Sequence, residues 1–455
     1  MPLSPPIPIV DDSETLTFYG RDWTRFWPPA PAGVVFPESV EQLAELVRWA
    51  RDRRVALVPS GGRTGLSGGA VAAAGEVVVS LDRMRKVIDF DPVDASMTVQ
   101  AGLTVGELQR RAEEQGLCYP VDWAAADSAQ CGGSVATNAG GIRVLRYGMT
   151  REWVRGLKVV DGRGETMVLN RGLLKNNSGY DLRHLMIGSE GTLGLIAEIT
   201  FGLAPAPPDR SVMLLALSGT DAVLPVYSGF RQSLPLSAFE FLDRGCVQAV
   251  AASGQREFPL DDEAPCHVLV EFDDPEQRNQ EHALQIFETL LGEQLAIDGV
   301  ISQSAAQAEG LWVWREAISE SITPRTPYKS DLAVRISRIP SFLDALGELV
   351  ARRFPDFEVL WFGHIGDGNL HMNVLRPESW SVDEFRSACD ALAPEIFDLV
   401  TRFGGTLSAE HGIGLLKRDH LSRVHSPAEI TAMRGIKQLL DPAGILNPGK
   451  LLPPA

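Results

Sequence analysis

The amino-acid sequence predicts a two-domain α+β protein, and three observations lead to this fold class. The chain has 455 residues, more than the roughly 250–300 at which one hydrophobic core stops growing. Up to about residue 200, helical and extended patterns alternate between glycine-rich turns. A proline-rich segment at 203–210 (LAPAPPDR) then precedes a second series of apolar strands and amphipathic helices. We therefore expect a domain boundary near residue 205.

The elements of the first domain follow from hydrophobic periodicity and capping residues. Helix periodicity behind Ser39 predicts a helix at 39–53, and a second helix is expected after Thr104. A polar glycine turn inside 157–169 (LKVVDGRGETMVL) is typical of a hairpin. The remaining strands are expected at 54–59, 76–81, 96–102 and 194–203.

The second domain, residues 206–425, alternates apolar strands with amphipathic helices. This pattern favours one antiparallel sheet with helices on one face. A capped helix and a Pro/Gly-rich tail at 426–455 are expected to pack back against the first domain, residues 1–205. The strands are expected within 211–218, 266–272, 331–337 and 358–365, and the helices near 276–292, 340–354 and 383–403.

Composition excludes several classes of protein. A net charge of −17 argues against a nucleic-acid partner, because phosphate binding needs clustered Lys and Arg. The five cysteines are scattered without a CxxC pair, so neither a disulfide frame nor a Cys-ligated zinc is expected. The sequence contains no apolar stretch that is long and uncharged enough to predict a membrane span. Its acidic, proline-rich start is unlike a secretory signal. A cytoplasmic location is therefore expected.

Glycine-rich loops are the main sign of a phosphate-bearing ligand. They occur at 59–69 (PSGGRTGLSGG), 132–141 (GGSVATNAGG) and 187–194 (IGSEGTLG). Glycine allows positive φ and removes the Cβ, so successive N–H groups can converge on an anion. One such loop would be an ordinary surface turn, whereas the set of them suggests a long diphosphate ligand. The sequence contains neither GxGxxG opening a helix nor GxxxxGK[ST], which disfavours a Rossmann domain and a P-loop.

These loops, in this order, resemble the FAD-linked oxidases of the vanillyl-alcohol oxidase and p-cresol methylhydroxylase type. The resemblance implies an FAD-binding domain of two subdomains over about 25–205. No histidine lies in or near the first two loops, so a non-covalent flavin is expected. The implied flavin contacts are Pro59, Gly61, Gly62, Arg63, Thr64, Gly65, Gly68, Gly69, Gly132, Gly133, Ser134, Thr137, Asn138, Gly140, Gly141, Gly188, Ser189, Glu190, Gly194, Ile196 and Asn447.

Two further segments concentrate histidines and a carboxylate in glycine-punctuated turns. GHIGDGNLHMN at 363–373 carries His364 and His371, and SAEHGIG at 408–414 carries Glu410 and His411. Two imidazoles and one carboxylate form a common catalytic metal set that leaves positions for substrate. His411 would then be the base, although the sequence also allows His411 as ligand with Glu410 orienting it.

The same segments resemble the metal-dependent D-2-hydroxy-acid dehydrogenase branch of this family. The resemblance assigns His364, His371 and Glu410 as metal ligands, His411 as base and Asn373 as a substrate contact. It also implies hydride transfer from the substrate to flavin N5. Zinc suits this ligand set best, and manganese, iron(II) and cobalt stay open.

Arg315, Ser319 and Lys329 could hold a second carboxylate of the substrate. An arginine on an amphipathic helix is by itself most often a surface group. The resemblance favours Arg315 and Lys329 as anchors, with Ser319 where threonine is usual. This predicts D-2-hydroxyglutarate, with D-malate as a shorter analogue, and D-lactate or glycolate as the runner-up, since a monoacid would leave both cations unpaired.

Other functions remain in competition. The His/Glu set alone also fits a metal-dependent hydrolase, and the chain could be a flavin-bearing subunit of a larger assembly. An electron-transfer flavoprotein, a quinone or a cytochrome could accept the electrons. A homodimer is a reasonable expectation for an enzyme of this kind.

Overall fold

The structure is a computed structural model that describes residues 4–24, 26–254, 257–260 and 263–453, and it divides into two compact units. Unit 1 comprises residues 1–141, 148–206 and 410–455, and unit 2 comprises residues 142–147 and 207–409. The chain therefore leaves unit 1 after residue 206, close to the expected boundary. We expected the C-terminal segment to begin at residue 426, whereas the segment that returns to unit 1 begins at Glu410.

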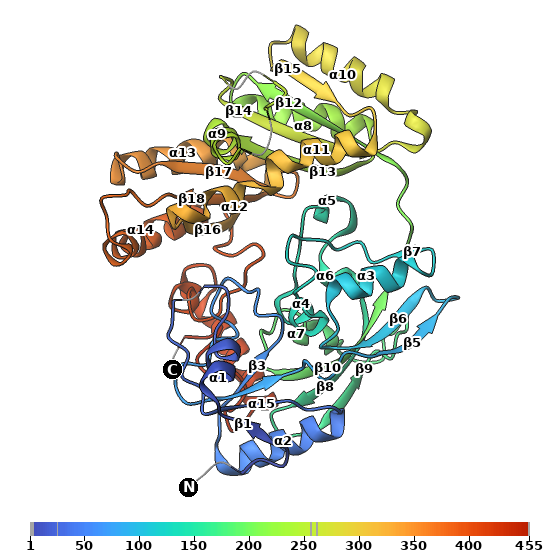
Figure 1. The fold of residues 1–455 in the computed structure, drawn as a ribbon, viewed down its shortest axis with the longest axis vertical. Helices are drawn as coiled ribbons and strands as arrows, with labels where there is room; N and C mark the ends of the chain where they lie inside the picture. Colours follow the sequence, from blue (N-terminus) through green and yellow to red (C-terminus); the bar gives the residue numbers. More distant parts are fainter. Residues whose placement is uncertain (1–3, 25, 255–256, 261–262, 454–455) are drawn as a thin grey trace. The chain divides into compact units, whose positions relative to one another are not determined.

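Unit 1 contains two main sheets (Figure 1). The smaller has the order β1-β2-β4-β3, in which β2, β4 and β3 are parallel and β1 is antiparallel. The larger is antiparallel, with the order β5-β6-β10-β8-β9. The strands are β1 (Ile9–Val10), β2 (Gly33–Val35), β3 (Leu57–Ser60), β4 (Val77–Ser80), β5 (Val87–Asp91), β6 (Ser96–Gln100), β7 (Leu117–Cys118), β8 (Val154–Asp161), β9 (Thr166–Leu169), β10 (Gly194–Gly202) and β11 (Ala204–Pro205).

The predicted helices of unit 1 form where their caps and periodicity place them. The Ser39 side chain accepts from Gln42 N at the start of α2, whose Leu43, Leu46 and Val47 are buried. The Thr104 side chain likewise caps α3 by accepting from Glu107 N. The helices are α1 (Ser13–Tyr19), α2 (Val40–Arg53), α3 (Val105–Glu113), α4 (Cys131–Thr137), α6 (Thr150–Trp153), α7 (Arg183–Met186) and α15 (Pro427–Leu440).

The second glycine segment is mostly helical, which corrects the expectation of an extended loop. Residues 131–137 form α4, which ends at Asn138 in the left-handed conformation with φ 50°. A Cβ at Gly132 would lie 2.7 Å from the Ala101 side chain, so the helix packs closely against the end of β6. Glycine is unfavourable in helices in general, and close packing against a strand overrides that preference here.

Unit 2 is built on one antiparallel sheet with the order β15-β12-β14-β13-β17-β18-β16. The antiparallel sheet of the predicted second domain is thus confirmed. Its strands are β12 (Arg210–Leu217), β13 (Leu236–Asp243), β14 (Cys266–Asp273), β15 (Ala296–Ile301), β16 (Tyr328–Ala333), β17 (Val359–Gly363) and β18 (Asn369–Val374). Its helices are α5 (Val144–Tyr147), α8 (Val223–Ser233), α9 (Arg244–Ala252), α10 (Gln280–Gly292), α11 (Ala305–Glu316), α12 (Ile318–Ile322), α13 (Ile339–Arg353) and α14 (Val382–Arg402).

Helices pack on both faces of this sheet, not on one as expected. Ala238 shares a core cluster with Trp312 of α11. The next strand residue, Phe239, packs its ring 5.0 Å from Tyr227 of α8. Successive strand residues point to opposite faces, so α8 and α11 cover different faces. The uninterrupted burial of β14 (CHVLVEFD) has the same cause, because a strand covered on both sides has no face exposed to solvent.

Residues 142–147 lie within the first domain in sequence but belong to unit 2. Arg143 pairs with Glu271 at 2.8 Å, and Arg146 pairs with Asp273 at 2.8 Å, both on β14. Each carboxylate is buried, and the Arg143 side chain is 18% exposed whereas that of Arg146 is 43% exposed, so the first pair is the better shielded from solvent. A segment too short to show periodicity gives no sign of this placement in the sequence.

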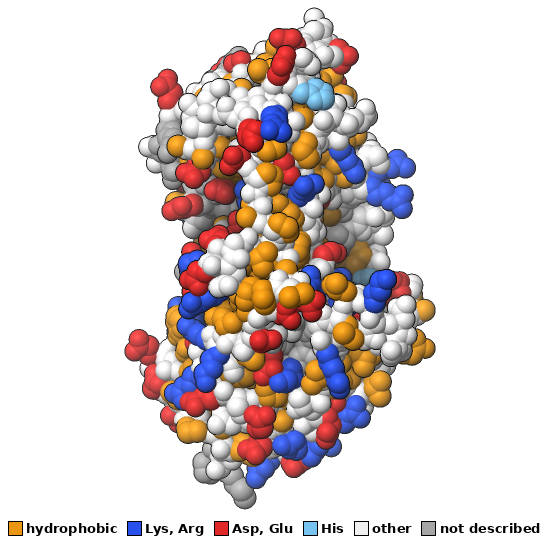
Figure 2. Space-filling view, turned by 90° about the vertical axis from the view of Figure 1, so that its right-hand side faces the viewer, with side chains coloured by type: hydrophobic (Ala, Val, Ile, Leu, Met, Phe, Trp, Pro, Cys, Tyr) orange, Lys and Arg blue, Asp and Glu red, His pale blue; other side chains and the backbone are white. Residues whose placement is uncertain are grey.

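The described surface carries both signs of charge. Figure 2 shows acidic and basic side chains interspersed over the face that it draws. Within the described residues, no helix combines the length and apolar character needed to cross a membrane.

Candidate active site

The three glycine segments of unit 1 converge at one place. Gly188 N donates to Val135 O and Glu190 N donates to Ala136 O, which joins the third loop to α4. A Cβ at Gly191 would lie 2.4 Å from the Pro59 ring, so the third loop also packs against the first. The structure therefore assembles segments that are more than 100 residues apart in sequence.

The C-terminal segment holds this arrangement through two side chains. Asn447 Nδ2 donates to Gly69 O at 2.9 Å and to Glu190 O at 2.7 Å, which ties the first loop to the third. The buried Glu190 carboxylate accepts from the N–H groups of Ile413 and Gly414, each at 2.8 Å. Burial raises the pKa of Glu190, and these two N–H donors oppose that shift. Glu190 therefore anchors residues 413–414, so its carboxylate is already occupied by the protein.

Several buried polar atoms at these loops have no partner in the described protein, which fits a bound polar ligand. Buried polar side-chain atoms in proteins are almost always hydrogen-bonded, so unpaired atoms at these loops are available to a bound group. The atoms are Ser60 Oγ, Gln130 Oε1, Ser189 Oγ and Asn447 Oδ1. Gly62 leaves no room for a side chain, since a Cβ there would lie 2.0 Å from Ser128 O, whereas a Cβ at Gly65 or Gly133 would meet nothing within 4 Å. These observations agree with a flavin held by the convergent loops.

Some of the expected flavin contacts have their side chains engaged within the protein. Arg63 donates to Gly61 O, and its guanidinium lies 4.4 Å from the Phe18 ring and 4.5 Å from the Tyr19 ring. Burial lowers the pKa of Arg63. The hydroxyl of Thr137 donates to Gly133 O within α4. A contact of these residues with a phosphate would therefore come from backbone N–H groups or a shifted side chain.

In unit 2, four polar side chains share one face of the β16–β18 pair. Lys329 lies opposite Asn373, and Asp331 lies opposite His371 in the antiparallel register. Residues directly opposite each other on paired strands point to the same face, and so do residues two positions apart on one strand. Burial lowers the pKa of Lys329, and the buried Asn373 Nδ2 has no partner among the described residues. A half-buried ammonium and an unpaired amide donor on one face suit an anionic ligand.

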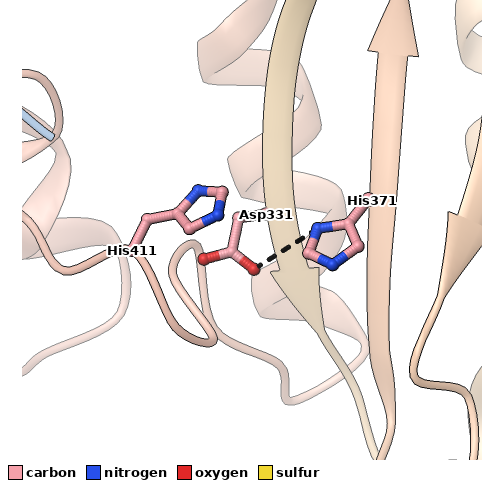
Figure 3. A group of neighbouring side chains, drawn as sticks. All are labelled: Asp331, His371 and His411. Carbon is pink, nitrogen blue, oxygen red and sulfur yellow. Dashed lines mark ion pairs between the residues drawn. The ribbon is translucent and has the colours of Figure 1, made fainter. Parts of the chain in front are cut away.

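The two histidines of the first motif lie beside each other. His371 is on β18 and His364 directly follows β17, and their ring centroids are 5.4 Å apart. His364 Nδ1 lies 2.8 Å from Glu240 Oε1. His371 Nδ1 lies 3.9 Å from Asp331 Oδ1, the ion pair drawn in Figure 3.

Glu410 and His411 follow immediately after the last residue of unit 2, Ala409. The chain reaches them from Thr406, which pairs with Ala333 at the end of β16. Two sets of three residues each have ligand atoms, ring nitrogens or carboxylate oxygens, that lie within 4.8 Å of one another inside the set. The first set is His364, His371 and Glu410, and the second is Asp331, His371 and His411. Figure 3 shows the second set. The first set contains the three residues assigned as ligands from the sequence, whereas the second places His411 with His371 and Asp331 and without His364.

The predicted diacid anchors lie on or beside the same sheet face. Arg315, in the last turn of α11, is buried and stacks 4.7 Å from the Phe362 ring of β17. Phe362 lies opposite His371, so it points to the face that carries Lys329 and Asn373. Ser319 follows one turn later, on α12, and is half-buried.

Sequence analysis missed Glu240, Asp331 and Gln130. Glu240 and Asp331 lie inside the strands LSAFEFLD and YKSDLA and are 1% and 0% exposed. An acid within an otherwise apolar strand is rarely buried unless it is paired, and that signal could have identified both. Gln130 precedes α4 and donates to Asp82, and nothing in the sequence distinguishes it from a surface glutamine.

Comparison with known proteins matches both halves of the chain to domain families. Residues 31–170 match the FAD binding domain, and residues 206–451 match the C-terminal domain of FAD linked oxidases. The second match alone covers more than half of the chain.

Similar proteins extend over nearly the whole sequence. The chain is 52% identical over 447 residues to a D-2-hydroxyglutarate dehydrogenase of Xanthomonas citri pv. viticola, covering 98% of this chain and 94% of that protein. It is 46% identical to a protein of the same name from Stutzerimonas stutzeri, covering 97% and 96%. A mitochondrial D-2-hydroxyglutarate dehydrogenase of Bos taurus is 37% identical, covering 98% and 81%.

A solved structure supports the fold. p-Cresol methylhydroxylase with substrate bound superimposes with a TM-score of 0.74 at 17% identity, covering 98% of this chain and 94% of that chain. The expected p-cresol methylhydroxylase-type fold is therefore confirmed.

Proposed function

This chain belongs to the family of FAD linked oxidases, and we propose that it is an FAD- and divalent-metal-dependent dehydrogenase that oxidises D-2-hydroxyglutarate to the 2-oxo acid. D-Malate, the shorter diacid, would be a weaker substrate. The names of the similar bacterial and bovine proteins support the substrate, and the two family matches support the flavin.

One observation carries the proposal: candidate metal ligands and two cationic side chains, Lys329 and Arg315, gather at one sheet face. His371, Lys329 and Asn373 share the face of β16 and β18, and Arg315 stacks on Phe362 of the same face. A substrate with a hydroxy acid at one end and a carboxylate at the other needs both kinds of group. A monoacid would offer no second carboxylate to Lys329 or to the terminal nitrogens of Arg315, whose Nε is already paired with Glu240.

The reaction removes a proton from the substrate hydroxyl and two electrons with the second hydrogen from C2, leaving a C=O bond. His364, His371 and Glu410 would hold the metal, and His411 would take the hydroxyl proton as general base. Asn373 Nδ2 would donate to the substrate, while Arg315, Lys329 and Ser319 would hold its distal carboxylate. A bound metal would lower the pKa of the substrate hydroxyl, and a non-covalently bound FAD would accept the hydride at N5.

Metal identity follows from the donor set. Two imidazoles and a carboxylate suit zinc, and the same donors also bind manganese, iron(II) or cobalt. The proposal also includes an electron acceptor, either an electron-transfer flavoprotein or a quinone. It includes a homodimeric state as well.

Anaerobic reduction of the flavin tests the proposal directly. Purified protein would be mixed with D-2-hydroxyglutarate, D-malate or D-lactate without oxygen, before and after EDTA, while flavin absorbance is followed. We expect rapid bleaching by D-2-hydroxyglutarate that EDTA abolishes and zinc or manganese restores. Bleaching by D-lactate alone would favour the lactate or glycolate alternative, and a yellow protein that no hydroxy acid bleaches would refute the dehydrogenase assignment.

The variant His371→Ala separates the metal from the flavin. His371 lies in unit 2, whereas the convergent glycine loops lie in unit 1. We expect this variant to lose the metal, measured by elemental analysis, and to retain FAD. A metal content equal to that of the unaltered protein would contradict the ligand assignment.

A further inference from the structure

A buried carboxylate that the proposed mechanism does not use connects two of its residues. Glu240 lies on β13 and is 1% exposed. Its Oε2 accepts from Arg315 Nε at 2.7 Å, and its Oε1 lies 2.8 Å from His364 Nδ1. One side chain thus contacts both the candidate metal ligand and the candidate carboxylate anchor.

Strand register explains how Glu240 reaches His364. Phe241 lies opposite Gly363 and Leu242 lies opposite Phe362 in the β13–β17 pair. One step further along the same register brings Glu240 opposite His364. Glu240 and Leu242 point to the same face, and Leu242 shares its core cluster with Phe362, over which Arg315 stacks.

The contact with Glu240 defines the chemistry of His364. A carboxylate accepts hydrogen bonds, so the neutral imidazole carries its proton on Nδ1 in this contact. Nε2 is then the ligand atom for a metal. A carboxylate on the second ring nitrogen also fixes the ring orientation and increases the basicity of the ligand.

The same carboxylate fixes the plane of Arg315. Its Nε is occupied by Glu240, and none of the described residues accepts a hydrogen bond from Nη1 or Nη2. A guanidinium held at Nε and stacked on Phe362 presents its two terminal nitrogens in a fixed direction. That geometry allows bidentate binding of a carboxylate.

We propose that Glu240 is a positioning residue that orients the metal ligand His364 and the distal-carboxylate anchor Arg315 together. The role at Arg315 rests on the proposed function, whereas the role at His364 requires only that the protein binds a divalent metal. Glu240 touches neither substrate nor metal in this role. It links the strength of metal binding to the recognition of the diacid.

The variant Glu240→Gln tests the proposal, because an amide has one acceptor oxygen and cannot serve both partners. Metal affinity would be measured on chelator-treated, flavin-loaded protein by competition between zinc and a fluorescent chelator. We expect affinity to fall about 10- to 100-fold, the usual effect of losing such a partner. With metal in excess, KM for D-2-hydroxyglutarate should rise about tenfold while kcat changes less, because binding of the distal carboxylate is weakened.

Glu271→Gln is the matched control. Glu271 lies on β14 of the same sheet, is 3% exposed and pairs with Arg143 at 2.8 Å. Its described hydrogen-bond partners are Arg143, Ser237 and Trp312, so the variant loses a buried ion pair that includes neither His364 nor Arg315. We expect lower thermal stability in both variants, with unchanged metal affinity and KM only in Glu271→Gln. Equal losses in the two variants, or unchanged metal affinity and KM in Glu240→Gln, would overturn the proposal.

The tautomer of His364 supplies a test that needs no folded variant at Glu240. The chain has eight histidines, and the His364 signal in a ¹⁵N-histidine spectrum of the zinc-loaded protein can be assigned by comparison with His364→Ala. We expect the proton on Nδ1, and a proton on Nε2 would refute the role of Glu240 at His364. If no hydroxy acid reduces the flavin of the unaltered protein, the proposed function fails, and the tautomer and metal affinity still decide this part.

Discussion

Arg315 illustrates what the sequence can and cannot reveal about a single residue. The family resemblance identified it as a candidate anchor, but a sequence cannot show that it is 7% exposed or that its partner is Glu240, 75 residues earlier. Pairing across strands depends on strand register, and register cannot be predicted from the sequence when the connecting turns are irregular. His364 and His371 were found because each lies in a glycine-punctuated motif. Asp331 was missed because it lies inside the strand YKSDLA, where only Lys329 was considered as a functional residue.

Replacing Arg315 with alanine should change substrate preference. We expect kcat/KM for D-2-hydroxyglutarate to fall about 10- to 100-fold, because a charge-assisted contact is lost, with D-lactate oxidation unchanged. Steady-state kinetics with an artificial electron acceptor measures both. Arg325→Ala is the control, since Arg325 forms an exposed pair with Glu358 and should affect neither substrate. Equal losses on the two substrates would count against a distal-carboxylate role.

Lys450 should make the stability of the protein depend on alkaline pH. It is 4% exposed, its nearest carboxylate, Glu76, is 3.9 Å away, and burial lowers its pKa to about 8. A lysine whose pKa is lower when folded binds fewer protons than when unfolded, so the free energy of unfolding rises between pH 8 and 10.5.

Lys450→Met removes this dependence. At pH 7 we expect the variant to be more stable by up to about 3 kcal/mol, with the difference shrinking towards pH 10.5. Thermal unfolding midpoints of the two flavin-loaded proteins between pH 7 and 10 measure it. A difference that does not change with pH would mean that Lys450 keeps an ordinary pKa.

At the scale of elements, α4 shows why the flavin loops were only partly predictable. The glycine content of GGSVATNAGG indicated close approach correctly, and the structure confirms tight packing at Gly132. The same composition concealed a helix. A glycine-rich stretch of seven residues has neither the helix propensity nor the length to show helical periodicity. Likewise, the apolar strand CHVLVEF was recognised, whereas its burial on two faces was not.

Asn447 should control flavin retention, because its amide joins the first and third loops. We expect Asn447→Ala to weaken FAD binding about tenfold or more through the loss of two hydrogen bonds. Release of fluorescent FAD on dilution gives the affinity. Asn447 has φ 42°, so Asn447→Gly removes the amide without backbone strain and should release FAD equally. Tight FAD binding in the glycine variant would assign the effect to strain.

For the whole molecule, the sequence predicted the passage between domains near residue 205 but not the return at Glu410. Residues 410–425 lack the periodicity of a helix or strand, and their attachment depends on single contacts such as Gly414 N with Glu190. The placement of residues 142–147 with unit 2 was invisible for the same reason, since it depends on Arg143 and Arg146 finding acids on β14.

Truncation after Ala409 should abolish FAD binding although all three glycine segments remain. The deleted residues include the partners of Leu57, which donates to Ile445 O and accepts from Asn447 N. Flavin absorbance of the purified truncated chain measures retention. Truncation after Leu452 is the control and should leave FAD bound. A yellow protein ending at Ala409 would show that the loops are sufficient without the C-terminal segment.

The interrupted course of unit 1 has a consequence for synthesis in the cell. At about 5–20 residues per second, roughly 10–40 s pass between translation of residue 206 and of residue 410. During that interval the glycine segments exist without Asn447 or the partners of Glu190. We therefore expect flavin to bind only after unit 2 and residues 410–447 have been translated.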